Sequence, residues 1–183
     1  KAAAWHNNLG VKVKWIDAEK VSDEVFKDVD GIVVPGGFGA RGIEGKVAAA
    51  RYALENKVPY LGLCLGLQVA VIAAARKAGL ENANSTEFTD TTENVVYLME
   101  DQAGKELTGG TMRLGDYPAK LVNGSKIREI YGSDEIIERH RHRYEVNNTY
   151  RELLSANGMK FSGTSPDGDL VEIVELPDHP WYL

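Results

Sequence analysis

One cysteine stands alone in this sequence, and the residues around it favour nucleophilic chemistry. Cys64 lies in the stretch PYLGLCLGLQ, with Gly62 two residues before it and Gly66 two residues after it. An apolar run ends at this point and a helical pattern begins, as at a nucleophile on a sharp strand-to-helix turn. Small neighbours let strand and helix approach closely and leave the sulfur accessible. Because a helix N-terminus favours the thiolate over the thiol, the pattern predicts a reactive cysteine.

A second glycine turn, GGFG, follows the preceding predicted strand. Its first residues, Gly36 and Gly37, end an apolar run. The carboxyl ends of adjacent parallel strands meet at one edge of a sheet, so we expect this turn to lie beside the cysteine. A bare backbone N–H of this Gly-Gly turn and the N–H of Leu65 would then face the oxyanion that forms when a thiolate attacks a carbonyl. The turn lacks the dinucleotide spacing and the lysine of a P-loop, which argues against a phosphate-binding loop.

These patterns also have plain structural interpretations. Free cysteines are most often small buried apolar residues, and a glycine turn is most often a loop. The run ERHRHRYEVN has two interpretations as well. On one strand, Arg139, Arg141 and Arg143 would share a face, and the two histidines would share the other face with Tyr144. Three arginines on one face suit an anion or a domain interface, but on an acidic protein they also suit a solvated edge.

The periodicity of the apolar residues predicts the elements that position these side chains. In the first half we expect strands at 11–17, 30–35 and 58–63, and helices at 22–28, 44–56 and 67–80. Ser22 suits a helix N-cap, and Gly79 suits a C-cap. From about Asn84 onward we expect strands at 111–122, 136–147, 159–168 and 170–177, with short helices near 125–132 and 150–158. This order predicts an α/β fold with a mostly parallel central sheet, helices on both faces, and antiparallel strands in the second half.

Composition limits the functions that we expect. The 183 residues suffice for one domain with a sizeable core, and 43% hydrophobic and 26% charged residues are ordinary globular values. A net charge of −6 argues against a nucleic-acid surface. The sequence shows no run long enough to span a membrane, no secretory signal, and too few cysteines for a disulfide or a zinc site. We therefore expect a cytoplasmic protein that binds neither nucleic acid nor membrane and has no metal site.

Six segments in order extend these patterns over nearly the whole chain: VPGGFGARGIEGK, PYLGLCLGLQ, NSTEF, GGTMRLGDYPAKL, ERHRHRYEVN and FSGTSPDGDLVEIVEL. Together they resemble the class I (triad-type) glutamine amidotransferase domain of CTP synthases, for which GTMRLG and RHRHRYEVN are specific. The resemblance implies a flavodoxin-like class I glutamine amidotransferase fold. It also implies hydrolysis of L-glutamine through a cysteine thioester. The ammonia would pass to an N-terminal synthetase domain that uses ATP to aminate UTP to CTP, a ligase reaction of pyrimidine biosynthesis.

The same resemblance assigns roles to particular residues. Cys64 matches the nucleophile, and Gly37 and Leu65 match the oxyanion-hole donors. The positions that match glutamine-binding residues are Gly37, Phe38, Leu65, Gln68, Glu87, Arg143 and Tyr144. A carboxylate such as Glu87 suits an α-ammonium, and a guanidinium such as Arg143 suits an α-carboxylate. The resemblance implies no cofactor in this domain, ATP and Mg in the synthetase domain, GTP as an activator, and a homo-tetramer.

The chain departs from this family at both ends. The family's general base is the histidine of a His-Pro-Glu segment, but the sequence stops at LPDHPWYL, where His179 matches an earlier His-Pro. We therefore expect residues 1–183 to be a single glutamine amidotransferase domain that is trimmed at both ends. Three alternatives stay open: the glutaminase of another class I amidotransferase, a non-catalytic interaction domain if the His and Glu are absent, and a stand-alone cysteine hydrolase.

Overall fold

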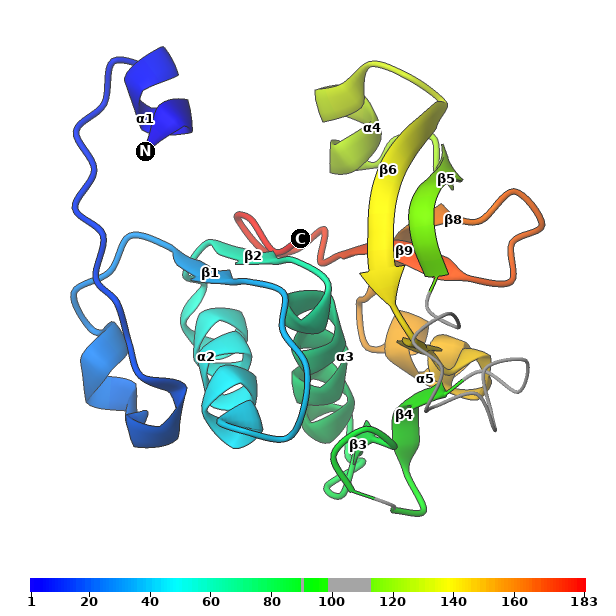
Figure 1. The fold of residues 1–183 in the computed structure, drawn as a ribbon, viewed down its shortest axis with the longest axis horizontal. Coiled ribbons are helices and arrows are strands. Elements are labelled where there is room, and N and C mark those ends of the chain that lie inside the picture. Colours follow the sequence, from blue (N-terminus) through cyan, green and yellow to red (C-terminus); the bar gives the residue numbers. More distant parts are fainter. Residues whose placement is uncertain (90, 99–112) are drawn as a thin grey trace.

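Two short parallel strands and the two helices packed on them form the first half of the chain (Figure 1). The computed structural model describes residues 1–89, 91–98 and 113–183. Strands β1 (Ile32–Val34) and β2 (Tyr60–Gly62) pair in parallel, with Ile32 opposite Tyr60. Helices α2 (Ile43–Asn56) and α3 (Leu65–Lys77) follow the two strands and pack against each other. The chain returns to this sheet at Tyr182, which bridges in parallel to Tyr60.

The core between these elements is made of small and β-branched residues. Ala50 and Ala53 on α2 are fully buried, and so are Val69, Val71 and Ile72 on α3. Small side chains at a helix crossing allow a close approach of the two axes, and the β-branched residues fill the space beneath the sheet. Both helices are confirmed, and α2 lies within one residue of its predicted bounds. Helix α3 begins two residues and ends three residues earlier than predicted, with Ala78 as the C-cap, and Gly79 follows in the left-handed region at φ +101°.

Two further sheets make up the second half. A three-stranded sheet contains β3 (Asn84–Ser85), β4 (Asn94–Leu98) and β7 (Tyr144–Val146). A four-stranded antiparallel sheet has the order β6 (Glu135–His142), β5 (Arg113–Leu121), β8 (Lys160–Thr164) and β9 (Val171–Glu175). The remaining helices among the described residues are short: α1 (Ala2–His6), α4 (Lys126–Tyr131), α5 (Arg151–Ala156), and the 3-10 helices η1 (Ala18–Lys20), η2 (Asp23–Phe26) and η4 (Asn148–Tyr150).

The strand predicted at 136–147 is divided at Arg143. Before this residue, β6 pairs with β5, and after it, β7 pairs with β4 of the other sheet. The prediction of one continuous strand was therefore wrong. The alternation holds only up to His142, so Arg139 and Arg141 are exposed on one face while His140 and His142 point inward. Arg143 lies at the switch between the two sheets.

Other differences from the sequence prediction are local. Residues 11–17 form no strand in the part of the chain that the structure describes, and Trp15 is 91% exposed. Alternating residues define two faces, but a strand also needs a partner for its backbone groups. Ser22 precedes the 3-10 helix η2, but its side chain makes no capping hydrogen bond. Strands β3 and β4 were not predicted, and Thr111 and Met112 of the strand predicted at 111–122 lie outside the described residues.

The fold class is confirmed: parallel strands and helices in the first half, and antiparallel strands in the second. The described parallel pairings are β1 with β2, β3 with β4, and the bridge between Tyr60 and Tyr182. Among the described helices, none is both long enough and apolar enough to cross a bilayer.

Candidate active site

Cys64 occupies a strained turn between β2 and α3. It is the N-cap of α3, and its backbone angles are φ 56° and ψ −105°. Positive φ in a residue other than glycine costs about 1–3 kcal/mol and is concentrated at functional sites. The hydroxyl of Tyr60 donates a buried hydrogen bond of 2.8 Å to the carbonyl of Gly66, which ties the strand to the first turn of the helix. The strand-to-helix turn predicted for Cys64 is therefore present.

The two flanking glycines are required by close packing. A Cβ atom on Gly62 would lie 2.5 Å from the carbonyl of Gly66, and a Cβ atom on Gly66 would lie 2.2 Å from the oxygen of Val34. Contacts this short are not tolerated between a side chain and backbone. Gly62 and Gly66 therefore let β2, α3 and β1 approach closely enough to hold the turn in place.

Three main-chain groups surround the sulfur of Cys64. The backbone N–H groups of Leu65 and Gly37 both donate toward Sγ, and the carbonyl oxygen of Arg141 lies 3.9 Å from it. The GGFG turn and the cysteine therefore meet at one edge of the β1–β2 sheet, as the sequence predicted. Two converging N–H donors beside a nucleophile are the arrangement that stabilises an oxyanion.

The pKa of the Cys64 thiol is raised, which contradicts the prediction that the thiolate is favoured. Burial of the sulfur is the main cause, and the negative charges of Glu87 and Glu145 add to it. The N–H groups of Leu65 and Gly37 lower the pKa but do not outweigh burial. The surroundings of Cys64 thus favour the thiol over the thiolate, and its activation needs a proton acceptor.

Glu87 and Arg143 lie close together beside the GGFG turn. The backbone N–H of Gly39 donates to Glu87 Oε1 at 2.7 Å. Burial raises the pKa of Glu87, and the Gly39 N–H and the positive charges of Arg143 and Lys46 oppose that rise. The Nε of Arg143 is buried and has no hydrogen-bond partner among the described residues. A half-buried carboxylate and an unsatisfied guanidinium nitrogen are thus present where the resemblance implies recognition of an amino acid.

Gln68, Tyr144 and Phe38 complete the predicted set. Gln68 is buried on α3, and its Nε2 donates to the carbonyl of Tyr144 at 3.2 Å. Phe38 is 52% exposed, and the guanidinium of Arg141 lies 5.8 Å from the centre of its ring. The structure therefore brings all seven predicted glutamine-binding residues and Cys64 to one region, where β1, β2 and α3 meet the switch from β6 to β7.

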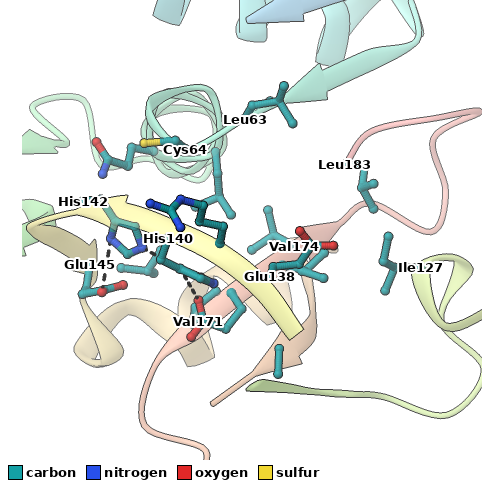
Figure 2. A pocket seen from close by; sticks show the side chains of 18 of the residues that line it. Leu63, Cys64, Ile127, Glu138, His140, His142, Glu145, Val171, Val174 and Leu183 are labelled. Carbon is teal, nitrogen blue, oxygen red and sulfur yellow. Dashed lines mark hydrogen bonds and ion pairs between the residues drawn. The ribbon is translucent and has the colours of Figure 1, made fainter. Parts of the chain in front are cut away.

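A cavity of about 410 Å³ opens beside this region (Figure 2). Apolar side chains form much of its wall, among them Leu63, Ile127, Val174 and Leu183. Figure 2 shows Cys64 at the elbow above strand β6 and the two histidines on that strand. The sulfur therefore borders a partly apolar chamber as well as the polar group around Glu87.

No described hydrogen bond joins a histidine to Cys64. The Nδ1 of His142 faces the carbonyl of Tyr144 at 3.3 Å, and its Nε2 contacts Nδ1 of His140 at 2.9 Å. His179 is buried, with Nε2 bound to the carbonyl of Ala53 and Nδ1 accepting from Trp181 N. His6 is exposed on α1. Among the described residues, the histidines that form hydrogen bonds therefore contact groups other than the Cys64 thiol.

Sequence reasoning missed two contributions to the site. The carbonyl of Arg141 reaches the sulfur, and Lys46 acts on the charge of Glu87. Lys46 lies in GARGIEGK, directly after the glycine turn, so its presence in the first turn of α2 was a usable signal. The contact from Arg141 carried no such signal because it comes from the backbone of a strand that is 77 residues away.

Comparisons with known proteins agree with this geometry. The family described as Glutamine amidotransferase class-I matches residues 2–182. A CTP synthase of Caldanaerobacter subterraneus subsp. tengcongensis is 55% identical over 189 residues, which cover 100% of this chain and 35% of the relative. A CTP synthase of Carboxydothermus hydrogenoformans is 56% identical over 187 residues, covering 99% of this chain and 35% of the relative. The chain thus spans about a third of the length of these relatives.

One solved structure is similar over most of its own length. The glutaminase domain of Trypanosoma brucei CTPS, solved with bound acivicin, has a TM-score of 0.91 and 36% sequence identity to this chain. The match covers 98% of this chain and 73% of that one.

Proposed function

Because this chain belongs to the class-I glutamine amidotransferase family, we propose that it hydrolyses L-glutamine to glutamate and ammonia through a thioester on Cys64. One observation carries the proposal. Cys64 sits at positive φ on the β2–α3 elbow, with two converging backbone N–H donors at its sulfur. This is the arrangement that acyl transfer to a side-chain nucleophile requires.

In the proposed reaction the Cys64 thiolate attacks the side-chain amide carbon of glutamine. The carbonyl oxygen becomes an oxyanion, which the N–H groups of Gly37 and Leu65 stabilise. The C–N bond then breaks as the nitrogen takes up a proton and leaves as ammonia, and a γ-glutamyl thioester remains on Cys64. Water attacks this thioester and releases glutamate and the thiol. The raised pKa of Cys64 means that the first step needs a general base to take the thiol proton.

The glutamine is held by charge complementarity at its α-carbon. Glu87 receives the α-ammonium, and Arg143 pairs with the α-carboxylate through the guanidinium whose Nε has no described partner. The Gly39 N–H fixes one oxygen of Glu87, which leaves the other available for the substrate. Phe38, Gln68 and Tyr144 form the remaining contacts. These assignments follow from the resemblance and are supported by the proximity of the residues.

Protection of the thiol tests this function directly. Iodoacetamide alkylates Cys64, and we expect L-glutamine and acivicin to slow that alkylation by occupying the site, whereas D-glutamine should not. Mass spectrometry of the labelled peptide measures the rate. Cys64→Ser is the control for labelling elsewhere, because Cys64 is the only cysteine in the sequence. An alkylation rate that is indifferent to L-glutamine and acivicin would refute the proposed substrate.

We infer further that the ammonia serves CTP synthesis, since the relatives that contain a matching segment are CTP synthases. This proposal includes a synthetase domain that consumes the ammonia together with UTP, ATP and Mg. It also includes activation by GTP and assembly into a tetramer. A cytoplasmic location belongs to it too, and is supported by the single unpaired cysteine.

A chimera tests this wider role. The matching third of the Caldanaerobacter enzyme is replaced by this chain, which is 55% identical to it. We expect glutamine-dependent formation of CTP, and we expect Cys64→Ala in the chimera to abolish it while CTP formation from added ammonia persists. Loss of both activities in the Cys64→Ala chimera would contradict the assignment of Cys64 to ammonia release.

A further inference from the structure

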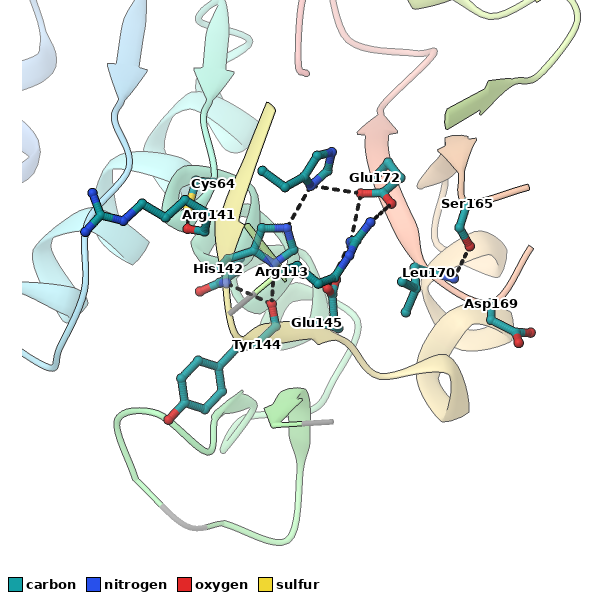
Figure 3. Close-up of polar contacts among 12 residues, drawn as sticks. Cys64, Arg113, Arg141, His142, Tyr144, Glu145, Ser165, Asp169, Leu170 and Glu172 are labelled. Atoms are coloured by element: carbon teal, nitrogen blue, oxygen red, sulfur yellow. Dashed lines mark hydrogen bonds and ion pairs between the residues drawn. The ribbon is translucent and has the colours of Figure 1, made fainter. Parts of the chain in front are cut away.

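A buried ion network lies on the far side of strand β6 from Cys64. Arg113 donates to Glu172 at 2.7 Å and to Glu145 at 3.0 Å. The side chains of Arg113, Glu145 and Glu172 are only 10%, 4% and 3% exposed. Figure 3 shows Cys64 and Arg141 on one side of β6 and the three charged groups on the other. Glu145 and Glu172 line the same cavity as Cys64, but no described hydrogen bond or ion pair joins Arg113 to Cys64, Glu87 or Arg143.

The network joins the two sheets at the point where the chain passes from one to the other. Arg113 begins β5 and stands opposite His142, the last residue of β6. Glu172 belongs to β9 of the same four-stranded sheet, whereas Glu145 belongs to β7 of the three-stranded sheet. The guanidinium thus bridges the sheets across Arg143, which lies between β6 and β7.

Two histidines extend this link along the backbone. The Nδ1 of His142 faces the carbonyl of Tyr144 on the other side of the switch, at 3.3 Å. His140 contacts His142 at 2.9 Å and Glu172 at 3.5 Å. The histidines and Glu172 place three ligand atoms within 4.8 Å, which would suit a metal ion. Since the Arg113 guanidinium already pairs with the Glu172 carboxylate, the arrangement favours an ion-pair clamp over a cation site.

The residues that this clamp holds are those of the glutamine site. The Tyr144 carbonyl accepts from Gln68, and the Arg141 carbonyl contacts the Cys64 sulfur. Between them lies Arg143, whose Nε has no hydrogen-bond partner among the described residues. A change in the angle between β6 and β7 would displace Arg143 and both carbonyls together.

We propose that Arg113 is a positioning residue that clamps the β6–β7 switch, and thereby holds Arg143 and the Tyr144 carbonyl where glutamine binds. This inference rests on the proposed glutaminase function. It assigns to the arginine of GTMRLG a part in substrate binding that is exerted through Glu145 and Glu172 and not by contact. A bidentate fork is needed for two separate carboxylates, so lysine is expected to replace it only in part.

Labelling of Cys64 with two reagents tests the clamp in the full 183-residue chain. Diazo-oxo-norleucine, an electrophilic glutamine analogue, reports the glutamine site through the concentration that half-saturates labelling. Iodoacetamide reports only the reactivity and exposure of the thiol. For Arg113→Met we expect the half-saturating concentration of the analogue to rise between about 10- and 100-fold, the range expected for small misplacements. The iodoacetamide rate should stay near that of the wild type.

Several variants separate positioning from loss of folding. Removing one partner of a buried pair leaves the others unpaired, so Arg113→Met is also made with Glu145→Gln and Glu172→Gln. This neutral triple variant should fold and still bind the analogue weakly. Arg113→Lys should bind with intermediate affinity, and it serves as the test if neither methionine variant folds. Arg76→Met is the matched control, since Arg76 pairs bidentately with Glu44 twelve residues along α3 from Cys64.

The labelling experiments distinguish a failure of the proposed clamp from a failure of the proposed glutaminase function. In one outcome, the glutamine analogue labels the wild type saturably, and the folded Arg113 variants need the same half-saturating concentration. This would overturn the clamp and leave the glutaminase proposal standing. A parallel fall of both labelling rates would show a merely structural role and overturn the clamp as well. Unsaturable labelling of the wild type would overturn both, because there would be no glutamine site to position.

Discussion

Opposing effects meet at the sulfur of Cys64. Burial and the charges of Glu87 and Glu145 raise the pKa of the thiol, while the N–H groups of Leu65 and Gly37 lower it. The same N–H groups are the donors proposed for the oxyanion. The site is therefore arranged to stabilise charge on the substrate oxygen, while the raised pKa of Cys64 means that a base is needed to take the thiol proton.

Glu87 affects both the pKa of the Cys64 thiol and the proposed binding of glutamine. Glu87→Gln removes a negative charge that raises the pKa of Cys64, so iodoacetamide at pH 8 should alkylate the thiol faster than in the wild type. The same change should weaken protection by L-glutamine at least tenfold, because the α-ammonium loses its carboxylate. Labelling rates with and without glutamine measure both effects. Glu44→Gln on α2 is the control. Equal protection by L-glutamine in all three proteins would mean that Glu87 does not bind the α-ammonium.

Gly37 supplies one of the two N–H groups at the sulfur. A Cβ atom there would lie 3.1 Å from Leu65 Cδ2, and a β-branched side chain would add two more atoms in the same space. In the chimera, Gly37→Val should lower the glutamine-dependent kcat by about 100- to 1000-fold, the usual loss for one oxyanion donor. Gly10→Val is the control, since a Cβ on Gly10 meets nothing within 4 Å. A folded Gly37→Val chimera with normal turnover would remove Gly37 from the mechanism.

At the scale of secondary-structure elements, the elbow between β2 and α3 depends on the close approach of α3 to β1. Gly66→Ala would put a Cβ atom 2.2 Å from the carbonyl oxygen of Val34, so β1 and α3 must separate. We expect the free energy of unfolding to fall by at least about 1–3 kcal/mol, the cost typical of overpacking. Urea unfolding of Gly66→Ala beside Gly10→Ala measures this difference. Equal midpoints would mean that the elbow tolerates a wider spacing.

The predictable parts of the fold were those set by nearby residues. Helices α2 and α3 and the strands β1 and β2 follow from local periodicity, and the Cys64 elbow follows from the glycines two residues away. The segment 11–17 shows the limit of this reasoning, because its alternation could not reveal whether a partner strand was available. The division of the strand at Arg143 likewise depends on pairing with β4 and β5, which no local pattern encodes.

The residues of the candidate site likewise differ in how far the sequence alone could predict them. Cys64, Leu65 and the Gly36-Gly37 turn could be proposed from turns and strand order, whereas the roles of Gly37, Glu87 and Arg143 in particular came only from the resemblance. The Arg113 clamp was missed altogether, because its partners lie 32 and 59 residues away in sequence. In the sequence a single arginine in GTMRLG has no visible counter-charge, and only the packing of two sheets brings Glu145 and Glu172 to it.

At the scale of the whole molecule, the clamp makes stability depend on pH. Burial and the positive charge of Arg113 lower the pKa of His142 to about 4. As the pH falls from about 6.5 to about 4, the unfolded chain binds a proton at this histidine that the folded chain does not bind. Protonation therefore favours unfolding over this window, by up to about 3 kcal/mol at its acidic end. Above pH 7 the histidine is neutral in both states and the effect vanishes.

Unfolding in urea at a series of pH values checks this dependence. His142→Asn keeps an amide beside the Tyr144 carbonyl but cannot titrate, so its stability should fall less between pH 7 and pH 4 than that of the wild type. His6→Asn changes an exposed histidine and serves as the control. Because His142 contacts Glu145 and His140, the difference measures the titration of His142 together with its effect on these two neighbours. Parallel curves would exclude a buried neutral His142.

The main-chain groups around the Cys64 sulfur also bear on how substitutions could weaken the binding of a covalent inhibitor. The two N–H donors and the Arg141 carbonyl are main-chain groups, so codon changes at those positions alter side chains but leave these three groups in place. A covalent compound that takes its affinity from them offers few single-step routes to resistance. Escape mutants selected against it should therefore accumulate at the side chains that admit the compound, such as Glu87 and Arg143. Compounds that rely on those two charges instead should lose potency after one substitution.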